Sequence, residues 1–189
     1  MQIQQSKSMI HKSSQKLVRV SFEVLSADDI QAILTLENLV MAKLKDQTYY
    51  YSGGEHYYQK IFFDYGTFLG VKTNFAQLIA FSALITTYEK EILEYARLVD
   101  LNKRPWTEIC ILDTVVVAPE FRGNGIQREL VQQLMELAKI KHSKKYMLCT
   151  VHPENTFSLN NFIKLGFEIK SSKIIYGGLS RYILLKNLD

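Results

Sequence analysis

The stretch "APEFRGNGIQREL" (residues 118–130) places a proline, an arginine and two closely spaced glycines directly before a helical pattern. The segment before it, "EICILDTVVV" (residues 108–117), is β-branched and apolar, which predicts a buried strand. Over residues 126–141, apolar side chains recur at intervals of three and four and predict an amphipathic helix. Gly123 and Gly125 therefore mark a turn from a strand into a helix.

This strand-to-helix turn suits an anion. The start of a helix presents backbone N–H groups without intrahelical partners and the positive end of the helix dipole. Gly123 and Gly125 have no Cβ that would keep an anion away from these amides. A pyrophosphate fits such a turn, although a Gly-x-Gly pair taken alone is more often a plain tight turn.

Length and composition indicate a single globular domain. The chain has 189 residues, of which 47% are apolar and 22% are charged. Because it contains no membrane-spanning apolar run and no signal-peptide core, we expect a cytoplasmic protein. The net charge of +4 is spread along the chain, which disfavours nucleic-acid binding and is compatible with a small polyanionic ligand.

The metal and thiol chemistry of the chain is sparse. Cys110 and Cys149 lie in strand-like segments and are expected to be buried thiols rather than a disulfide or a nucleophile. The four histidines are scattered without the spacing of metal ligands, so we predict no metal site.

The order of the patterns predicts an α/β mixed sheet without a second domain. Residues 1–16 are polar and aperiodic, so we expect a flexible leader before one domain over residues 17–189. Residues 88–106 form a long connection whose structure the pattern does not decide. Strand patterns occupy residues 17–25, 67–74, 76–86, 108–117, 145–151, 167–175 and 180–186, and helical patterns occupy residues 26–45, 55–63, 126–141 and 155–165.

Three segments, in order, resemble the motifs of the GNAT family of acyl-CoA-dependent N-acyltransferases. The first, "VVVAPEFRGNGIQ" (residues 115–127), resembles the acyl-CoA motif of the family. The second, "TVHPENTFSLNNFIKLGFEI" (residues 150–169), and the third, "YGGLSRYILLKNL" (residues 176–188), are similar to its later motif and closing strands. The resemblance implies a mixed, mostly antiparallel central sheet flanked by helices in a single domain.

The resemblance also implies an activity, the transfer of an acetyl or other short acyl group from acyl-CoA to a primary amine by direct attack in a ternary complex. Acetyl-CoA would be the co-substrate, and no metal is implied. The amine acceptor, a small molecule or a protein or peptide, stays open, as does assembly into a homodimer. An acyl-CoA-binding regulatory module with little catalysis is the alternative function.

The family motif assigns the acyl-CoA contacts residue by residue. Backbone groups of Val115 and Val117 would pair with the pantetheine arm, and Asn155 and Ser158 would contact that arm from the later helix. Gln127 departs from the glycine or alanine usual at its position. The pyrophosphate contacts would come from Arg122, Gly123, Asn124, Gly125, Ile126 and Gln127.

Acyl transfer to an amine needs a base, because an ammonium group with a pKa near 10.4 is not a nucleophile. Asp113 matches the position where many family members carry a glutamate, and in a regular strand it shares a face with Val115 and Val117. A structural acid is the alternative role for Asp113. Glu108 is the second candidate base, and its opposite parity would require a bulge.

The general acid that would protonate the leaving thiolate is not assigned. The family often has a tyrosine four residues before the glycine of "LGF", where this chain has Phe162. Tyr176 or Tyr182 could replace it, and a thiolate is itself a tolerable leaving group because a thiol pKa is about 8.5. The absence of this tyrosine is also what raises the regulatory alternative.

The remaining polar and aromatic candidates lie in three short segments. His152 precedes a proline at a strand end and is expected at the rim of the cleft. The "TYYY" run of residues 48–51 and "HYY" of residues 56–58 either line an acceptor pocket or pack as structural aromatics.

Overall fold

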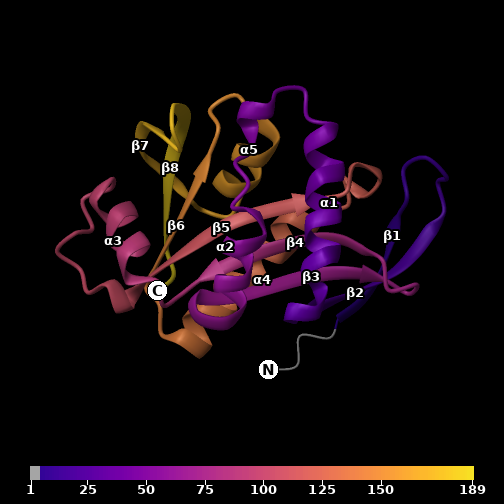
Figure 1. The fold of residues 1–189 in the computed structure, drawn as a ribbon, viewed down its shortest axis with the longest axis horizontal. Coiled ribbons are helices and arrows are strands. Elements are labelled where there is room, and N and C mark those ends of the chain that lie inside the picture. The colour runs from indigo at the N-terminus through magenta and orange to yellow at the C-terminus, as the bar shows by residue number, and fades with distance from the viewer. Residues whose placement is uncertain (1–4) are drawn as a thin grey trace.

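A twisted eight-stranded sheet forms the centre of the computed structural model, which describes residues 5–189 (Figure 1). The strands lie in the order β1-β2-β3-β4-β5-β6-β8-β7, and β5 and β6 are the parallel pair. This architecture confirms the predicted mixed, mostly antiparallel sheet. The strands are β1 (Gln5–Ile10), β2 (Leu17–Val24), β3 (Gly66–Thr73), β4 (Leu78–Ile85), β5 (Ile109–Val117), β6 (Tyr146–Val151), β7 (Glu168–Ile175) and β8 (Leu179–Asn187).

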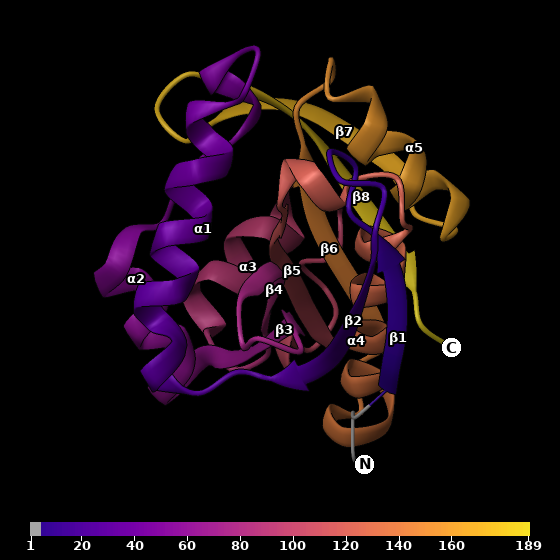
Figure 2. The same ribbon diagram turned by 90° about the vertical axis from the view of Figure 1, so that its right-hand side faces the viewer.

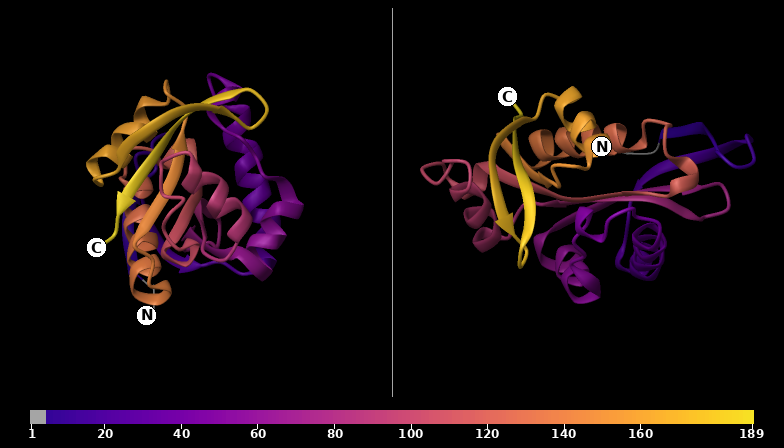
Figure 3. Two further views of the ribbon diagram at one scale, coloured as in Figure 1. Left: turned by 90° about the vertical axis from the view of Figure 1, so that its left-hand side faces the viewer. Right: turned by 90° about the horizontal axis from the view of Figure 1, so that it is seen from above.

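Helices cover both faces of the sheet. In Figures 2 and 3, α1 and α2 lie on one face, and α4 and α5 lie on the other. Each helix buries an apolar side, so the sheet is sandwiched between two layers of apolar contacts. The helices are α1 (Ile30–Ala42), α2 (Gly54–Lys60), α3 (Glu89–Arg97), α4 (Ile126–His142) and α5 (Thr156–Lys164).

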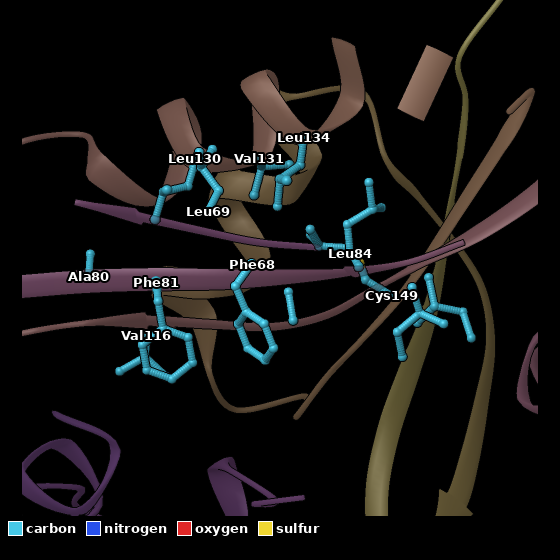
Figure 4. Close-up of a cluster of buried hydrophobic side chains, with 14 of the residues drawn as sticks. Phe68, Leu69, Ala80, Phe81, Leu84, Val116, Leu130, Val131, Leu134 and Cys149 are labelled. Atoms are coloured by element: carbon cyan, nitrogen blue, oxygen red, sulfur yellow. The ribbon is translucent and has the colours of Figure 1, made fainter. Parts of the chain in front are cut away.

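The core lies on both faces of the central strands. Figure 4 shows Leu130, Val131 and Leu134 of α4 pointing at one face of the sheet, while Phe68 and Phe81 lie on the other. All five side chains are fully buried. The two cysteines are buried free thiols, as predicted. No helix within residues 5–189 combines the length and the apolarity that crossing a membrane requires.

The prediction of a flexible leader is wrong from residue 5 onward. Strand β1 pairs antiparallel with β2, from Gln5 opposite Phe22 to Ile10 opposite Leu17. The turn that follows is held by a hydrogen bond from the Lys12 amide to the Glu120 carbonyl at 2.8 Å. A polar edge strand lacks the apolar alternation of a half-buried strand, which explains the error. Residues 1–4 of the expected leader lie outside the described residues.

The segment left undecided by the sequence, residues 88–106, contains helix α3. Its buried side chains Ile92, Tyr95 and Ala96 have helical spacing, and the helix packs against β5. The other predicted helices are confirmed with shifted ends. The second of them continues from α2 into a π-helical turn over residues 61–65. Gly166, with φ of +80°, follows α5 as the expected left-handed residue.

Gly66 provides a test of the packing at the start of β3. A Cβ built at this position would lie 1.8 Å from the Leu84 carbonyl oxygen, and backbone cannot move aside cheaply. We expect Gly66→Ala to lower the free energy of unfolding by about 3 kcal/mol.

Gly177→Ala is the matched control in chemical denaturation. Its φ of +73° is strained for alanine, but no atom lies within 4 Å of the added Cβ. We expect a cost of only about 1 kcal/mol there. Equal costs at the two glycines would contradict the close approach between β3 and β4.

Candidate active site

The candidate site opens where the parallel strands β5 and β6 separate. They pair only from Ile109 opposite Tyr146 to Ile111 opposite Leu148, although both strands continue beyond these residues. Beyond that point β6 remains paired with β8 up to Val151, and β5 remains paired with β4 up to Val117. Figure 1 shows the two strands diverging from their shared end. The inner edge of β5 is therefore left without a neighbouring strand.

The unpaired edge of β5 presents backbone groups to the opening. The Ala118 amide donates to the Ile79 carbonyl of β4 at 2.8 Å. The backbone groups of successive residues in a strand point to opposite sides. Those of Val116 therefore point toward β4, while those of Val115 and Val117 point toward the opening. The Arg122 Nε donates to the Val117 carbonyl at 3.3 Å. The geometry matches the edge that an added extended chain would pair with.

A β-bulge places Asp113 at this opening. On β4, Ala83 lies opposite Thr114 and Leu84 lies opposite Leu112, so Asp113 has no cross-strand partner. A bulge redirects a side chain and increases the local twist. The alternation of a regular strand therefore predicts the correct side for Val115. Asp113 lies at the opening because of a bulge, which the sequence pattern did not show.

Asp113 lies in the wall of a cavity of about 280 Å³. The cavity receives residues from β5, β6, β8, α2, α3, α5, the β7–β8 turn and the segment before α2. Part of its wall is apolar and part carries charged or hydroxyl groups, which is typical of a small-molecule site. The lining residues are Tyr49, Tyr50, Tyr51, Gly53, Tyr57, Glu91, Leu112, Asp113, Thr114, Val115, Cys149, Thr150, Val151, His152, Asn155, Ser158, Phe162, Tyr176 and Arg181.

Two carboxylates in the cavity share one phenol. The Tyr57 hydroxyl lies 3.1 Å from Asp113 Oδ1 and 2.9 Å from Glu91 Oε1. A phenol has a single proton, so it donates to one carboxylate at a time. When Asp113 is protonated, its own O–H can complete the second hydrogen bond.

The ionisation of these carboxylates is strongly perturbed. Burial, together with the charges of Glu91 and Glu37, raises the pKa of Asp113 to about 7, although the Tyr57 hydrogen bond opposes this rise. Burial likewise raises the pKa of Glu91. The pKa of Tyr57 is raised by burial and by the two carboxylates, so this phenol remains protonated. A carboxylate with a pKa near neutrality is suited to accept a proton at physiological pH.

A second, buried network fixes the aromatic wall of the cavity. Glu37 of α1 is only 2% exposed and accepts hydrogen bonds from Tyr50 at 2.7 Å, from Ser52 at 2.9 Å and from the Tyr58 hydroxyl. Tyr50 also lies 2.8 Å from Thr114 Oγ1. These bonds satisfy the buried carboxylate and tie the segment before α2 to β5.

The turn at Gly123 and Gly125 leaves open space beside the start of α4. Gly123 and Gly125 have φ of +95° and +76°, and no atom lies within 3.5 Å of a Cβ built on either. Within residues 5–189, the backbone amides of residues 123–128 make no hydrogen bond to protein. These free amides at the start of α4 fit an anionic phosphate group.

Two side chains of the family motif hold the site together instead of facing a ligand. Asn124 donates to the Ile10 and Phe121 carbonyls, both at 2.9 Å, which leaves its backbone amide free. Gln127 donates to Ser158 Oγ at 2.9 Å and accepts from Asn161 at 2.9 Å, so it joins α4 to α5. The departure at Gln127 therefore occupies the helix interface and leaves its own amide accessible.

Helix α5 brings further predicted contacts to the cavity. The Asn155 carboxamide oxygen accepts from the Ser158 amide at 3.3 Å as the N-cap of the helix, and both residues line the cavity. Phe162 also lines it and packs against Phe167, so no hydroxyl is present at the position of the usual general acid.

The structure separates the other candidates. Glu108 is excluded from the cavity: it lies in the turn before β5 and forms an ion pair with Lys145 at 2.5 Å, so its prediction as a second base is wrong. Tyr176 reaches the cavity, whereas Tyr182 does not line it. His152 lines it beside Tyr49, with ring centroids 4.8 Å apart.

The aromatic runs divide between the cavity wall and the core. Tyr49, Tyr50, Tyr51 and Tyr57 line the cavity, whereas Tyr58 is buried against Phe68 and Phe81. The two runs therefore supply most of the aromatic cavity wall and part of the core.

Sequence reasoning missed two residues near the site. Glu91 precedes Ile92 and lies four residues before Tyr95, so the helical spacing of residues 88–97 could have indicated its position. Lys12 lies in the supposed leader, and its Cε is 3.8 Å from a Cβ built at Gly123. This cation stands beside the free amides, and no local pattern indicates that the β1–β2 turn reaches them.

A family model decides the class of the protein. Residues 40–167, more than half of the chain, match the acetyltransferase (GNAT) family. The chain belongs to the acetyltransferase (GNAT) family. It is therefore an acyltransferase, as the resemblance of its motifs implied. No curated protein matches it in sequence.

Solved structures share its fold at low sequence identity. An N-acetyltransferase from Staphylococcus aureus Mu50 gives a TM-score of 0.67 with 16% identity, over 90% of this chain and 99% of that one. A variant of the spermidine N-acetyltransferase SpeG from Vibrio cholerae gives 0.62 and 16%, over 89% and 94%. The protein yncA from Salmonella typhimurium with its cofactor acetyl-CoA gives 0.63 and 15%, over 90% and 94%.

The coupling between Asp113 and Glu91 is testable by titration. Removing a neighbouring negative charge favours ionisation, so we expect Glu91→Gln to lower the pKa of Asp113 from about 7. The pKa should stay above the ordinary value of about 3.9 because burial remains. The carboxyl carbon shift of labelled aspartate, assigned with Asp113→Asn, measures the midpoint.

Glu89→Gln is the matched control for this titration. Glu89 is an exposed glutamate on the same helix, and its removal should leave the Asp113 midpoint in place. A midpoint near 4 in the unmodified protein, or one that Glu91→Gln does not move, would contradict the coupled pair.

Proposed function

We propose that this protein transfers an acetyl or other short acyl group from acyl-CoA to a primary amine by direct attack in a ternary complex. The observation that carries the proposal is the position of Asp113. This carboxylate, with a pKa of about 7, lies on a bulge between the free edge of β5 and the amine-sized cavity. Its proton affinity and its place beside the open edge are what a base for amine attack requires.

Acyl-CoA would lie in the opening between β5 and β6. The backbone groups of Val115 and Val117 that face away from β4 would pair with the pantetheine arm as an added strand would, with the Arg122 Nε giving up its bond to the Val117 carbonyl. The free amides from Gly123 to Gln127 would hold the pyrophosphate at the start of α4. Arg122 and Lys12 would add positive charge near it.

The residues of the cavity would then prepare the amine. Asp113 takes the proton that the amine gives up, and Tyr57 and Glu91 stabilise the protonated carboxyl through their shared hydrogen bonds. A backbone amide of β5 near Val117 donates to the oxygen on which negative charge develops. Acyl-CoA supplies the activated carbonyl and the leaving thiolate, whose ordinary pKa of about 8.5 makes departure feasible without Phe162 being a tyrosine.

The regulatory alternative keeps one specific observation in its favour. Phe162 occupies the place of the usual acid, and a protein that only senses acyl-CoA would not need that hydroxyl. Release of CoA with any amine, in a protein shown by calorimetry to bind acetyl-CoA, separates the two functions. Binding without release from any amine would favour the regulatory function.

Substitution of the proposed base tests the mechanism. We expect Asp113→Asn to lower kcat by roughly 100-fold or more, because an amide cannot accept the amine proton. The rise of kcat/KM with pH, centred near the Asp113 pKa of about 7, should disappear from the residual activity. CoA release across a range of pH values gives both quantities.

Two controls separate catalysis from binding. The affinity for acetyl-CoA should stay within about threefold in Asp113→Asn, because its contacts come from the edge of β5 and from α4. Asp64→Asn changes an exposed aspartate outside the cavity and should leave kcat unaltered. Full turnover by Asp113→Asn would refute the assigned base.

A further inference from the structure

Arg181 is a buried cation that lacks an anionic partner. It lies on β8, is only 3% exposed and lines the cavity. Its Nη1 donates to the neighbouring Ser180 carbonyl at 2.8 Å, and the ion pairs of residues 5–189 do not include it. A guanidinium group has five N–H donors, and burying its charge without a partner is costly. A ligand that brings a negative charge would offset this cost.

The surroundings of Arg181 are aromatic and neutral. Its guanidinium carbon lies 5.6 Å from the centre of the Tyr176 ring, on which Tyr51 stacks with ring centroids 4.6 Å apart. The Tyr176 hydroxyl bonds to the Tyr95 hydroxyl and lies 3.3 Å from Thr150 Oγ1. Burial lowers the pKa of Arg181, and only these phenols oppose the effect. No carboxylate of the described chain therefore neutralises the guanidinium.

The cavity consequently carries opposite charges on different walls. Asp113 and Glu91 supply the negative wall, where the amine is to be deprotonated. Arg181 supplies the positive wall, with the Tyr176 ring against it. A volume of about 280 Å³ suits a molecule the size of an amino acid. A polycation would be attracted by the carboxylates of Asp113 and Glu91 but repelled by Arg181.

We propose that the acceptor is a small amino acid whose carboxylate binds Arg181 while its amino group faces Asp113. This inference rests on the proposed function and narrows its substrate class. The guanidinium fork matches a carboxylate through two parallel N–H···O bonds, which orients the acceptor as well as holding it. Arg181 is thus a specificity-determining residue for the transfer reaction.

Matched pairs of acceptors test the proposal. Alanine, phenylalanine and glutamate are compared with ethylamine, 2-phenylethylamine and 4-aminobutyrate, in each of which the α-carboxylate is absent. Calorimetry measures their binding to protein saturated with CoA, and CoA release from acetyl-CoA measures turnover. We expect at least one amino acid to bind and react at least tenfold better than its partner without the α-carboxylate.

Substitution of Arg181 identifies the group responsible. Arg181→Gln should weaken binding of the preferred amino acid by about 30-fold or more. Arg181→Lys should weaken it by less, because lysine keeps the positive charge but loses the two parallel N–H donors of the guanidinium group. The matched control is Lys173→Gln, which removes an exposed cation directly opposite Arg181 on β7. It should leave the affinities for the amino acid and for its matched amine unchanged. Unchanged affinity for acetyl-CoA shows that each variant is folded.

The outcomes keep the two proposals distinct. Equal binding of amino acids and their matched amines, or an equal loss of affinity for both in Arg181→Gln, would overturn the acceptor assignment. Binding of an amino acid through Arg181 without CoA release would uphold that assignment and overturn the proposed transfer activity.

Discussion

Backbone pairing between β5 and β6 ends after Ile111 and Leu148, and the candidate site follows from that separation. Each strand keeps its outer neighbour, so the sheet stays continuous while its centre opens. An open edge in the middle of a sheet is stable only if water or a ligand satisfies its N–H and C=O groups. The same opening leads to the bulge at Asp113 and to the free amides at the start of α4. One break in the hydrogen-bond ladder thus leaves an open strand edge beside a cavity lined by the Asp113 carboxylate.

The electrostatics of the cavity work against the stability of the fold. The folded-state pKa of Asp113, about 7, is well above the ordinary value of about 3.9. The folded protein is therefore more stable when Asp113 is protonated than when it is ionised. This contribution is fully present below about pH 4 and is lost as the pH rises through 7. The buried Arg181, without an anion, also costs stability. Such costs are typical of sites where charge is kept available for a ligand.

Local patterns in the sequence predicted most elements of the fold. The strand before Gly123 and the helix after it carry strong apolar periodicity, and their order alone indicated a mixed sheet. Strand β1 was missed because its polar side chains give an edge strand no apolar alternation. Asp113 reaches the cavity wall through a bulge that the sequence could not show, since a bulge depends on the register with β4.

Long-range contacts explain what the sequence could not predict about the site. Glu91, Tyr57 and Asp113 come from α3, α2 and β5, and only tertiary packing brings them together. The same holds for Arg181. Its proposed role depends on its having no anionic partner among the described residues, and no local sequence pattern indicates this. Glu108 is close to Asp113 in sequence, which suggested that both could serve the site. In the structure Glu108 instead forms an ion pair with Lys145.

A crystal structure of the protein with CoA tests the central claim most directly, because the claim concerns where the separated strands place a ligand. We predict pantetheine density between β5 and β6, paired with the backbone of Val115 and Val117, and a pyrophosphate on the amides of residues 123–127 within reach of Lys12. The thiol should point toward Asp113. CoA bound elsewhere, or strands β5 and β6 paired along their full length with CoA excluded, would contradict the account.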